Sequence, residues 1–457
     1  MMKNYELIII GGGPGGYHAA DLAGKAGLNT LVIEKHRLGG VCLNEGCIPS
    51  KALLNSAKQY TYATQGEPYG IQAKDVTFHL NDVVQRKNQV VKALVAGVGF
   101  KMKSAKVTVL EGTAEVIKKE NEMFVIQVGE EVVRGERLVV ATGSTPILPP
   151  IEGVEAGLKA NRILTSKEIL DLTELPKQLV VIGGGVIGLE MASYFAQIGS
   201  QVTVVEMQPT IGGTLDLDIA NELKKTLEKQ GITFILNAKV TKVDTKEVIY
   251  NVNDKNETIP FDKVLLSVGR KANTQGLGLD NINVELTKGG AIITDSQMKT
   301  NIANVYAIGD VNGQSMLAHT AYKEAEVCVN NILGKADHIQ YEHVPSVIYT
   351  HPEVGSVGYT EAEAKAKGYD IKVSKLPVSY SGRHLAESND KSGLIKLIVD
   401  QKKQTLIGAH ICALYASEII LFLSAMMQLE IQIETLKQII YPHPTVGELI
   451  KDALFHL

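Results

Sequence analysis

Two cysteines near the N-terminus, Cys42 and Cys47, lie five residues apart in the segment GGVCLNEGCIPSK. Residues at this spacing have Cα atoms about 8 to 9 Å apart in a helix and roughly 16 Å apart in a strand. Because a disulfide needs a Cα separation below about 7 Å, the pair can close only over an irregular backbone. Gly46 and Pro49 are residue types that permit one. We therefore expect a strained, readily reduced disulfide, which suits redox chemistry.

The other two cysteines, Cys328 and Cys412, are expected to be small buried apolar residues. Four cysteines in 457 residues are too few for a secreted disulfide scaffold. For the close pair the alternative is a static disulfide, or two thiols that never meet. Disulfides in cytosolic proteins are rare, and those that occur are mostly catalytic or sensing.

The bulk composition predicts a globular protein of about three domains, since 457 residues are too many for one core. The net charge is −4 and no block of like charge is present, so neither nucleic acid nor a membrane surface is an expected partner. No metal site is expected. The longest apolar helical stretch, residues 419–429, would span about 16 Å of the roughly 30 Å that a bilayer requires. The N-terminus has no signal-peptide core, and we expect a cytoplasmic protein.

The elements that must position the thiols begin with the apolar run Leu7–Ile10, which leads into GGGPGG and then an alanine-rich stretch. Strand, G-x-G-x-x-G turn and helix form the context in which this motif binds dinucleotides. Gly11 would allow the tight turn, Gly13 the approach of a pyrophosphate and Gly16 the packing of helix on strand. The next apolar run ends at Glu34, whose carboxylate is placed to accept hydrogen bonds from a ribose.

The same unit occurs again at a constant offset of 172 residues. Residues 179–206, LVVIGGGVIGLEMASYFAQIGSQVTVVE, align without a gap to residues 7–34. Packing alone would not require three glycines and a terminal acid twice, so the chain is expected to bind two dinucleotides. Because the thiol pair follows the first unit, the first dinucleotide is expected to be a flavin, which exchanges electrons with disulfides. The matching positions of the second unit are Gly183, Gly185, Gly188 and Glu206.

The remaining patterns predict a long helix at residues 81–102, alternating strands over 106–140, and short strands at 346–349 and 394–399. The fold class is α/β, with two Rossmann-like domains, the second inserted in the first, and a C-terminal α+β domain. The expected divisions are residues 1–145 and 271–340 for the flavin domain, 146–270 for the second nucleotide domain, and 341–457 for a dimerisation domain.

Taken together, the motifs resemble those of the flavin-dependent pyridine nucleotide-disulfide oxidoreductases, and most closely the dihydrolipoamide dehydrogenase branch. The resemblance covers the whole chain in the expected order. The motifs that carry it are CLNEGCIPSK, the paired GGG turns, ATGSTP, SVGR, AIGD followed by MLAH, and the terminal HPTVGE.

The resemblance implies roles for individual residues near the thiols. Cys42 would exchange with substrate, and Cys47 would lie near the flavin. Lys51 and Glu190 would form an ion pair beside the isoalloxazine ring. It further implies FAD contacts for Gly11, Gly13, Gly16, Glu34, Lys51, Gly143, Asp310 (on the ribityl chain) and Ala318, and NAD contacts for Gly183, Gly185, Gly188, Glu206 and Gly269.

His443 is the expected acid/base, because Glu448 follows five residues later and prolines flank it. The chain departs from the family pattern at Pro442, where a smaller residue is common, and at Gly447, where serine is common. These changes could alter substrate approach without touching the dyad. Most of the eleven histidines are expected to carry no chemistry.

The implied reaction is oxidation of protein-bound dihydrolipoyl groups through the disulfide and FAD, with reduction of NAD⁺ to NADH. The implied partners are a second copy of the chain and the lipoyl domain of an acyltransferase subunit or a lipoylated carrier protein. The apolar surface from Ile419 to Met427 is expected to suit the second copy. The alternatives are a glutathione or mercuric reductase, a soluble transhydrogenase, or a flavoprotein that serves mainly as a scaffold. A transhydrogenase should lack one thiol of the pair, and both are present here. A mercuric reductase should carry further C-terminal cysteines, and none follows Cys412.

Overall fold

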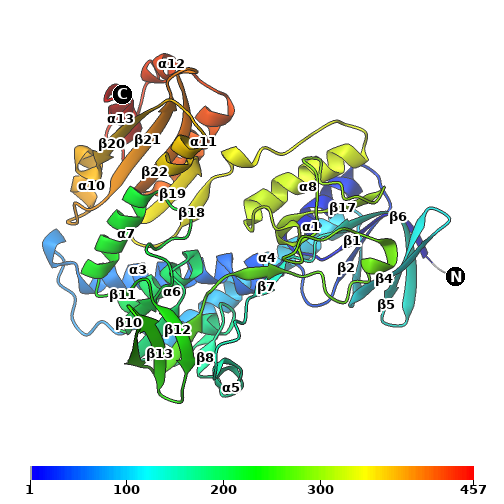
Figure 1. Ribbon diagram of the computed structural model, residues 1–457, viewed down its shortest axis with the longest axis horizontal. Coiled ribbons are helices and arrows are strands. Elements are labelled where there is room, and N and C mark those ends of the chain that lie inside the picture. Colours follow the sequence, from blue (N-terminus) through cyan, green and yellow to red (C-terminus); the bar gives the residue numbers. More distant parts are fainter. Residues whose placement is uncertain (1–2) are drawn as a thin grey trace. The chain divides into compact units, whose positions relative to one another are not determined.

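The computed structural model describes residues 3–457 and divides into two compact units (Figure 1). Each unit is assembled from three stretches of chain. Unit 1 comprises the residues through Ala52, Gln85–Ile147 and Gly269–Tyr341, and unit 2 comprises Leu53–Val84, Leu148–Val268 and Glu342–Leu457. Helices α3 (Cys47–Thr64) and α4 (Leu80–Ser104) have residues in both units.

A seven-stranded sheet forms the centre of unit 1 in the order β3-β2-β1-β6-β5-β4, with β17 paired to β6. The β1-β2, β1-β6, β2-β3 and β6-β17 pairs are parallel, and β4, β5 and β6 pair antiparallel. A separate two-stranded ribbon joins β7 to β16. The strands are β1 (Lys3–Ile10), β2 (Thr30–Glu34), β3 (Thr108–Glu111), β4 (Ala114–Glu120), β5 (Met123–Val128), β6 (Glu131–Val140), β7 (Ser144–Pro146), β16 (Arg270–Ala272) and β17 (Val305–Ala307).

The apolar run at the end of β1 is continuous because both faces of the sheet are covered. Leu7 and Ile9 belong to a buried cluster with residues of α1 (Pro14–Lys25) and α8 (Ala318–Ile332), which pack together on one face (Figure 1). Ile8 and Ile10 point the other way and join a cluster with the antiparallel strands. Cys328, on α8, is fully buried, which confirms the sequence interpretation of that thiol.

Unit 2 contains a five-stranded parallel sheet, β11-β10-β9-β15-β8, a three-stranded antiparallel sheet, β12-β13-β14, and a five-stranded antiparallel sheet, β18-β19-β22-β21-β20. The strands are β8 (Ile163–Leu164), β9 (Gln178–Ile182), β10 (Gln201–Val205), β11 (Thr233–Ile235), β12 (Lys239–Val243), β13 (Glu247–Val252), β14 (Lys255–Pro260), β15 (Lys263–Leu266), β18 (Ser346–Ile348), β19 (Glu353–Gly358), β20 (Ile371–Pro377), β21 (Leu394–Asp400) and β22 (Thr405–Ala413).

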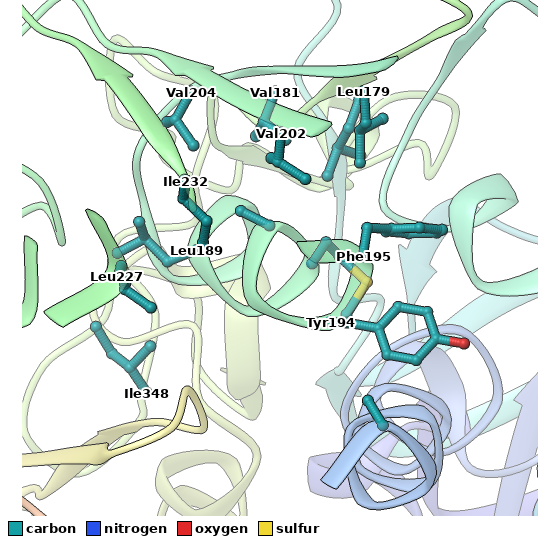
Figure 2. Packing of buried hydrophobic residues seen from close by; sticks show 14 of the residues in the cluster. Leu179, Val181, Leu189, Tyr194, Phe195, Val202, Val204, Leu227, Ile232 and Ile348 are labelled. Atoms are coloured by element: carbon teal, nitrogen blue, oxygen red, sulfur yellow. The ribbon is translucent and has the colours of Figure 1, made fainter. Parts of the chain in front are cut away.

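The parallel sheet of unit 2 packs against α6 (Val186–Gln197), whose sequence is apolar around most of its circumference and therefore predicts a buried helix. Leu189, Tyr194 and Phe195 are almost completely buried in one cluster with residues of β9 and β10. Figure 2 shows Phe195 near Leu179 of β9 and the Tyr194 ring turned away from the strands. The helices of unit 2 are α5 (Val154–Lys159), α6 (Val186–Gln197), α7 (Leu217–Lys229), α9 (Glu361–Ala366), α10 (Gly382–Glu387), α11 (Ala416–Gln428), α12 (Ile433–Lys437) and α13 (Glu448–Phe455).

On helix α11, the apolar surface is smaller than the predicted range 419–427. Ile419, Leu423 and Met427 are buried against the antiparallel sheet instead of facing outward. The outward-facing apolar residues are Leu421 and Phe422, which are 64% and 60% exposed. The reason is that the helix is apolar on two sides, and the sequence could not tell which side the sheet would cover.

Most predicted elements are confirmed: the long helix α4, the strands β3 to β6, and the strands β18 and β21. Residues 148–268 of unit 2 lie in the sequence between two stretches of unit 1, and the whole confirms the predicted fold class. Cys412, on β22, is buried as expected. Within residues 3–457, no helix combines the length and the apolar character needed to cross a membrane.

Candidate active site

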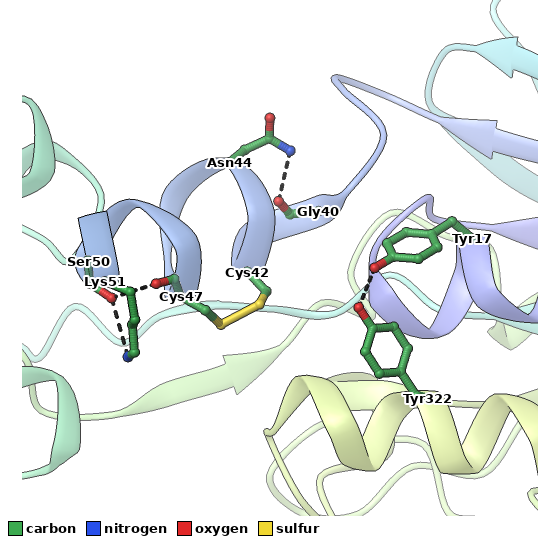
Figure 3. The surroundings of a disulfide bond; sticks show 8 residues. All are labelled: Tyr17, Gly40, Cys42, Asn44, Cys47, Ser50, Lys51 and Tyr322. Atoms are coloured by element: carbon green, nitrogen blue, oxygen red, sulfur yellow. Dashed lines mark hydrogen bonds between the residues drawn. A yellow bond between two sulfur atoms is a disulfide. The ribbon is translucent and has the colours of Figure 1, made fainter. Parts of the chain in front are cut away.

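The two thiols form a disulfide at a junction between two helices (Figure 3). Cys42 lies in α2 (Gly40–Glu45) and Cys47 is the first residue of α3, with Gly46 between the helices in a non-helical conformation. The break brings the two Cα atoms to 4.6 Å, well below the separation that a continuous helix would impose. The predicted irregular backbone is confirmed at Gly46. Pro49 instead occupies the first turn of α3, where a proline is tolerated because its missing N–H has no helical partner there.

The backbone around the disulfide is fixed by local hydrogen bonds (Figure 3). The Asn44 amide donates to the Gly40 carbonyl at 3.0 Å, which ties together the short helix that carries Cys42. The Ser50 hydroxyl donates to the Cys47 carbonyl at 2.9 Å, and Lys51 Nζ lies 3.4 Å from Ser50 Oγ. Each thiol is therefore held on a short, internally bonded helical segment.

Two tyrosines that sequence reasoning missed belong to the surroundings of the disulfide (Figure 3). Tyr17 follows the first glycine turn on α1, and its hydroxyl shares a hydrogen bond with the hydroxyl of Tyr322 on α8. Burial, and then the hydrogen bond to Tyr322, raise the pKa of Tyr17. The only sequence signal was the place of Tyr17 directly after the motif, since the 305 residues that separate the two tyrosines conceal their contact.

The first glycine turn has a separate structural reason for each glycine. Gly11 has φ +106°, and a Cβ there would lie 2.3 Å from the Ala141 carbonyl oxygen. A Cβ at Gly16 would lie 1.8 Å from the Gly11 carbonyl oxygen, so only glycine lets the helix pack this closely. For a Cβ at Gly13, the nearest non-neighbouring atom in the described chain would be Gly40 Cα, at 3.7 Å. The chain itself leaves room at Gly13, and the turn therefore fits the approach of a pyrophosphate.

The second turn repeats this geometry. Gly183 has φ +105°, and a Cβ there would lie 2.5 Å from the Ser267 carbonyl oxygen. A Cβ at Gly188 would lie 2.2 Å from the Gly183 carbonyl oxygen. Apart from its chain neighbours and the backbone of its own helix, no atom of residues 3–457 lies within 4 Å of the position that a Cβ at Gly185 would take. The second turn thus fits a second dinucleotide in the same way.

The acid that ends each second strand also supports its glycine turn. Glu34 accepts from the Gly12 amide at 2.7 Å and from the His36 amide at 2.8 Å. Glu206 accepts from the Gly184 amide at 2.6 Å and from the Gln208 amide at 2.7 Å. Each carboxylate is thereby oriented by the backbone, and its remaining lone pairs can accept from a ribose.

The other expected flavin contacts lie at the carboxyl ends of strands in unit 1. Asp310 lies in a one-turn helix, η4 (Gly309–Asn312), directly after β17 and accepts a hydrogen bond from the Ser144 hydroxyl. Arg270 donates to Ser144 Oγ at 2.7 Å and to its carbonyl at 2.8 Å. Burial lowers the pKa of the Arg270 guanidinium, although the neighbouring Asp310 and Glu45 act in the opposite direction.

Three further expected cofactor residues are glycines or alanine at element ends. Gly143 has φ +69°, and its carbonyl accepts from the Asn273 amide at 2.9 Å. Ala318 is the first residue of α8. Gly269, with φ +117°, was assigned to NAD from sequence and begins the third stretch of unit 1.

The expected ion-pair partners are on separate units. Lys51 is part of unit 1, and Glu190 lies on α6 in unit 2. Glu190 is 5% exposed, and its carboxylate accepts from the Tyr349 amide at 3.0 Å. The backbone after β18 therefore fixes the orientation of this carboxylate within unit 2.

The expected acid/base pair is formed within the C-terminal segment. His443 Nδ1 lies 2.9 Å from one carboxylate oxygen of Glu448 and 3.1 Å from the other. Desolvation would raise the pKa of Glu448, but the hydrogen bonds from the Thr445 amide and from His443 outweigh it and lower the pKa. The His443 side chain is 80% exposed in the single chain. An imidazole so oriented by a carboxylate can take up a proton at Nε2.

Comparison with known proteins gives consistent matches over nearly the whole chain. The family model described as pyridine nucleotide-disulphide oxidoreductase matches residues 5–325, and its dimerisation-domain model matches residues 344–454. A dihydrolipoyl dehydrogenase from Mycoplasma genitalium is 39% identical over 456 residues, which cover 98% of each chain. The mitochondrial dihydrolipoyl dehydrogenase of Pisum sativum is 40% identical over 98% of this chain and 90% of that one.

Two solved structures share the fold at full length. LpdA from Mycobacterium tuberculosis superposes with a TM-score of 0.89 at 26% identity, over 100% of this chain and 99% of that one. The Cu(II) complex of RclA, a HOCl-induced flavoprotein disulfide reductase from Escherichia coli, gives a TM-score of 0.87 at 29% identity, over 100% of both chains.

Proposed function

Because this chain belongs to the pyridine nucleotide-disulphide oxidoreductase family, we propose that it is the enzyme that oxidises protein-bound dihydrolipoyl groups and reduces NAD⁺ to NADH. The observation that carries the proposal is the Cys42–Cys47 disulfide at the helix junction. The 39% and 40% identity to dihydrolipoyl dehydrogenases, over 98% of this chain, supports the choice of substrate.

The family uses FAD and NAD(H), and the two glycine turns fit these cofactors. We propose that residues 1–145 and 271–340 bind FAD at the first turn, that residues 146–270 bind NAD at the second, and that residues 341–457 form the dimer contacts. When bound, FAD would accept two electrons from the reduced cysteines and deliver them as hydride to NAD⁺. Lys51 and Glu190 are assigned to the flavin environment.

The dithiol exchange itself needs only groups of the protein and the substrate. One substrate thiolate attacks Cys42 Sγ, and Cys47 departs as a thiolate. The second substrate thiol then displaces Cys42, so a lipoyl disulfide forms as the protein disulfide is reduced. His443 takes the proton of the first substrate thiol, and the departing Cys42 thiolate takes that of the second, so both protons are accounted for. Moving a proton from an unperturbed thiol of pKa near 8.5 to an unperturbed imidazole of pKa near 6.5 costs about 2.7 kcal/mol. The Glu448 carboxylate, 2.9 Å from His443 Nδ1, orients the ring.

A turnover assay with dihydrolipoamide and NAD⁺ tests the proposal directly. Glutathione disulfide and mercuric ion, supplied with NADH or NADPH, test the alternative reductase substrates. Turnover limited to dihydrolipoamide is the expected result. Failure to turn over dihydrolipoamide while another disulfide or metal ion is reduced would contradict the proposed substrate, and no turnover with any of them would favour the scaffold alternative.

The dimerisation-domain match supports a homodimer, and we propose that the two active sites are shared between its subunits. Each site would combine Cys42 and Cys47 of one chain with His443 and Glu448 of the other. Chains carrying Cys47→Ser and chains carrying His443→Ala, each inactive alone, are unfolded together and reassembled. About half the dimers would be mixed, each with one intact site, so roughly a quarter of wild-type activity should return. No recovery, with mixed dimers shown to be present, would contradict the shared site.

The macromolecular partner follows from the substrate. We propose a lipoyl domain of an acyltransferase subunit or a lipoylated carrier protein, in the cytoplasm, where a labile dithiol pair stays functional. Co-purification of the chain with its lipoylated partner distinguishes 2-oxoacid dehydrogenase complexes, including pyruvate, 2-oxoglutarate, branched-chain and acetoin types, from the glycine cleavage system.

A further inference from the structure

A buried carboxylate on α8 has no part in the chemistry described so far. Glu324 is 0% exposed, and its carboxylate accepts three hydrogen bonds. The Gly309 amide donates to one oxygen at 2.5 Å, and the Asn312 side-chain amide donates to the other at 3.0 Å. The Tyr341 hydroxyl donates to that second oxygen at 2.7 Å. The acid thus links three separate points of unit 1.

Two of these donors are the first and last residues of η4, the turn that carries Asp310. Gly309 has φ +74°, a conformation in which only glycine is free of strain. A one-turn helix cannot hold itself in place, because it makes too few internal hydrogen bonds. Glu324 supplies the missing restraint by bonding both ends of the turn at once.

The opposite side of Asp310 is restrained as well. The Ser144 hydroxyl donates to its carboxylate, and Arg270 donates in turn to Ser144. Asp310 is therefore restrained in two ways. Its carboxylate accepts from Ser144, which Arg270 holds, and its backbone turn is held by Glu324.

Burying a carboxyl group is costly, so its presence calls for a reason beyond packing. Burial raises the pKa of Glu324 above its usual value, and the bonds from Asn312, Tyr341 and the Gly309 amide act in the opposite direction without cancelling that rise. Three converging donors are what an ionised carboxylate needs in an apolar interior. An apolar side chain at this position would leave those donors buried without an acceptor.

We propose that Glu324 is a positioning residue for the flavin: it fixes both ends of η4 and so holds Asp310 for contact with bound FAD. This proposal rests on the proposed function, in which unit 1 binds FAD and Asp310 contacts it. Tyr341 and Asn312 take part as donors that orient the Glu324 carboxylate.

The test measures how fast the full-length holoenzyme releases FAD, from the rise in flavin fluorescence on dilution. Glu324→Gln keeps the side-chain shape but replaces one accepting oxygen with a donating NH₂ group, so either Gly309 or the Asn312–Tyr341 pair loses its acceptor. We expect release to accelerate about tenfold. Tyr341→Phe removes a single donor and should accelerate release about threefold, which keeps the test usable if Glu324→Gln folds poorly. The matched control is Glu326→Gln on the same helix, whose side chain is 43% exposed and should have no effect.

Coupling to Asp310 separates positioning from a general loss of stability. If Glu324 acts through Asp310, Glu324→Gln should add almost nothing to the FAD release rate of an Asp310→Asn chain. Equal acceleration by Glu324→Gln with and without Asp310→Asn would overturn the proposal, as would unchanged release in both Glu324→Gln and Tyr341→Phe. Unchanged release in Asp310→Asn alone would also overturn it. Failure of the wild-type chain to turn over dihydrolipoamide would instead contradict the proposed function, since release is measured without substrate.

Discussion

The two glycine turns of this chain match in the φ of their first glycine, +106° and +105°, and in their close backbone contacts, but the loops that return to them differ. In each, the loop after the acid returns to the turn and donates to the carbonyl of its second residue: the Gly39 amide to Gly12 and the Gly212 amide to Gly184, both at 2.8 Å. The repeat therefore extends beyond Glu206, which sequence comparison missed because one extra residue in the second loop changes the offset from 172 to 173.

What differs is how closely the returning loop covers the turn. A Cβ at Gly40 would lie 2.6 Å from Gly13 Cα, so this loop lies against the first turn. At the equivalent Gly213, and at Gly185 itself, a Cβ would meet no atom within 4 Å in the described part of the chain. The segment that leads to the disulfide thus touches the first turn beside Gly13, whereas the equivalent loop keeps clear of the second turn at Gly185; we call the first turn covered and the second open. This is the arrangement expected if FAD is retained through many turnovers while NAD exchanges in each one.

The largest effect, on turnover, should come from the disulfide segment that follows the covered turn. Cys47→Ser should lower dihydrolipoamide turnover by about 10⁴-fold or more, because the exchange step has no leaving thiolate. FAD should stay bound through the Gly11 turn, and NADH should still reduce it. Absorbance spectra and turnover measured on the same sample check this, and the long-wavelength flavin absorbance on partial reduction should vanish. Near-normal turnover in Cys47→Ser would show that the pair is not redox-active.

Helix α7, which follows the open turn, should instead affect the free energy of unfolding. There α7 begins after Asp216, a residue that is 2% exposed and bonded at 2.9 Å by Lys396, whose side chain is 3% exposed. Lys396→Met leaves this buried carboxylate without its cation and should cost about 3 to 5 kcal/mol of unfolding free energy at pH 7. Lys375→Met is the control, because Lys375 is 49% exposed and pairs with the outer carboxylate, Asp218, which is 32% exposed. Equal urea midpoints for the two variants would rule out a stabilising role for the buried cluster.

Lys396 also pairs with Asp218 at 2.8 Å and with Glu361 at 2.7 Å, and acid should weaken this four-residue cluster in a defined direction. Desolvation opposes ionisation of Asp218, but hydrogen bonds from Lys375 and Lys396 outweigh it and lower its pKa, and bonds from Lys365 and Lys396 lower that of Glu361. Groups with a depressed folded pKa stabilise the fold above their unfolded pKa, about 4, and lose that contribution as the pH falls further. The stability difference between wild type and Lys396→Met should therefore be full at pH 7 and shrink below about pH 4. A difference that grows on acidification would contradict this sign.

A matched pair of substitutions tests the covering loops themselves. Gly40→Ala places a methyl group against the first turn in a backbone with φ +59°, and it should accelerate FAD release more than about tenfold. Gly213→Ala has a similar φ of +68° and open space around it, so it should change the KM for NAD less than about threefold. Equal effects of the two changes would mean that the first turn is no more covered than the second.

The smallest effect concerns Glu34 and Glu206, the acids that follow the two glycine turns. No lysine or arginine lies between Ser200 and Leu223 to bind a 2′-phosphate, so the wild type should prefer NAD to NADP. Glu206→Gln should reduce that preference about tenfold in kcat/KM, because the amide no longer repels a phosphate. Glu34→Gln, the equivalent change after the first glycine turn, should leave the preference for NAD over NADP unchanged. Equal or better kcat/KM with NADP in the wild type would contradict the role of Glu206.

Much of this protein is determined by its sequence locally. The glycines, the acids and the Cys42–Cys47 spacing each impose their geometry on neighbouring residues, so the two glycine turns and the irregular backbone between the thiols could be predicted. The His443–Glu448 pair could be predicted too, because five residues separate its members.

Only the tertiary structure decided which distant polar groups meet. Lys396 lies in β21, where every residue is buried, and nothing in the letters LIKLIVD indicates that Asp216, 180 residues earlier, neutralises it. Glu324 resembled an ordinary helix-surface acid until the fold placed it against both ends of η4. A buried charge is tolerated only where its partners converge, and that convergence is set by the packing of sheets and helices, whose positions depend on contacts across the whole unit.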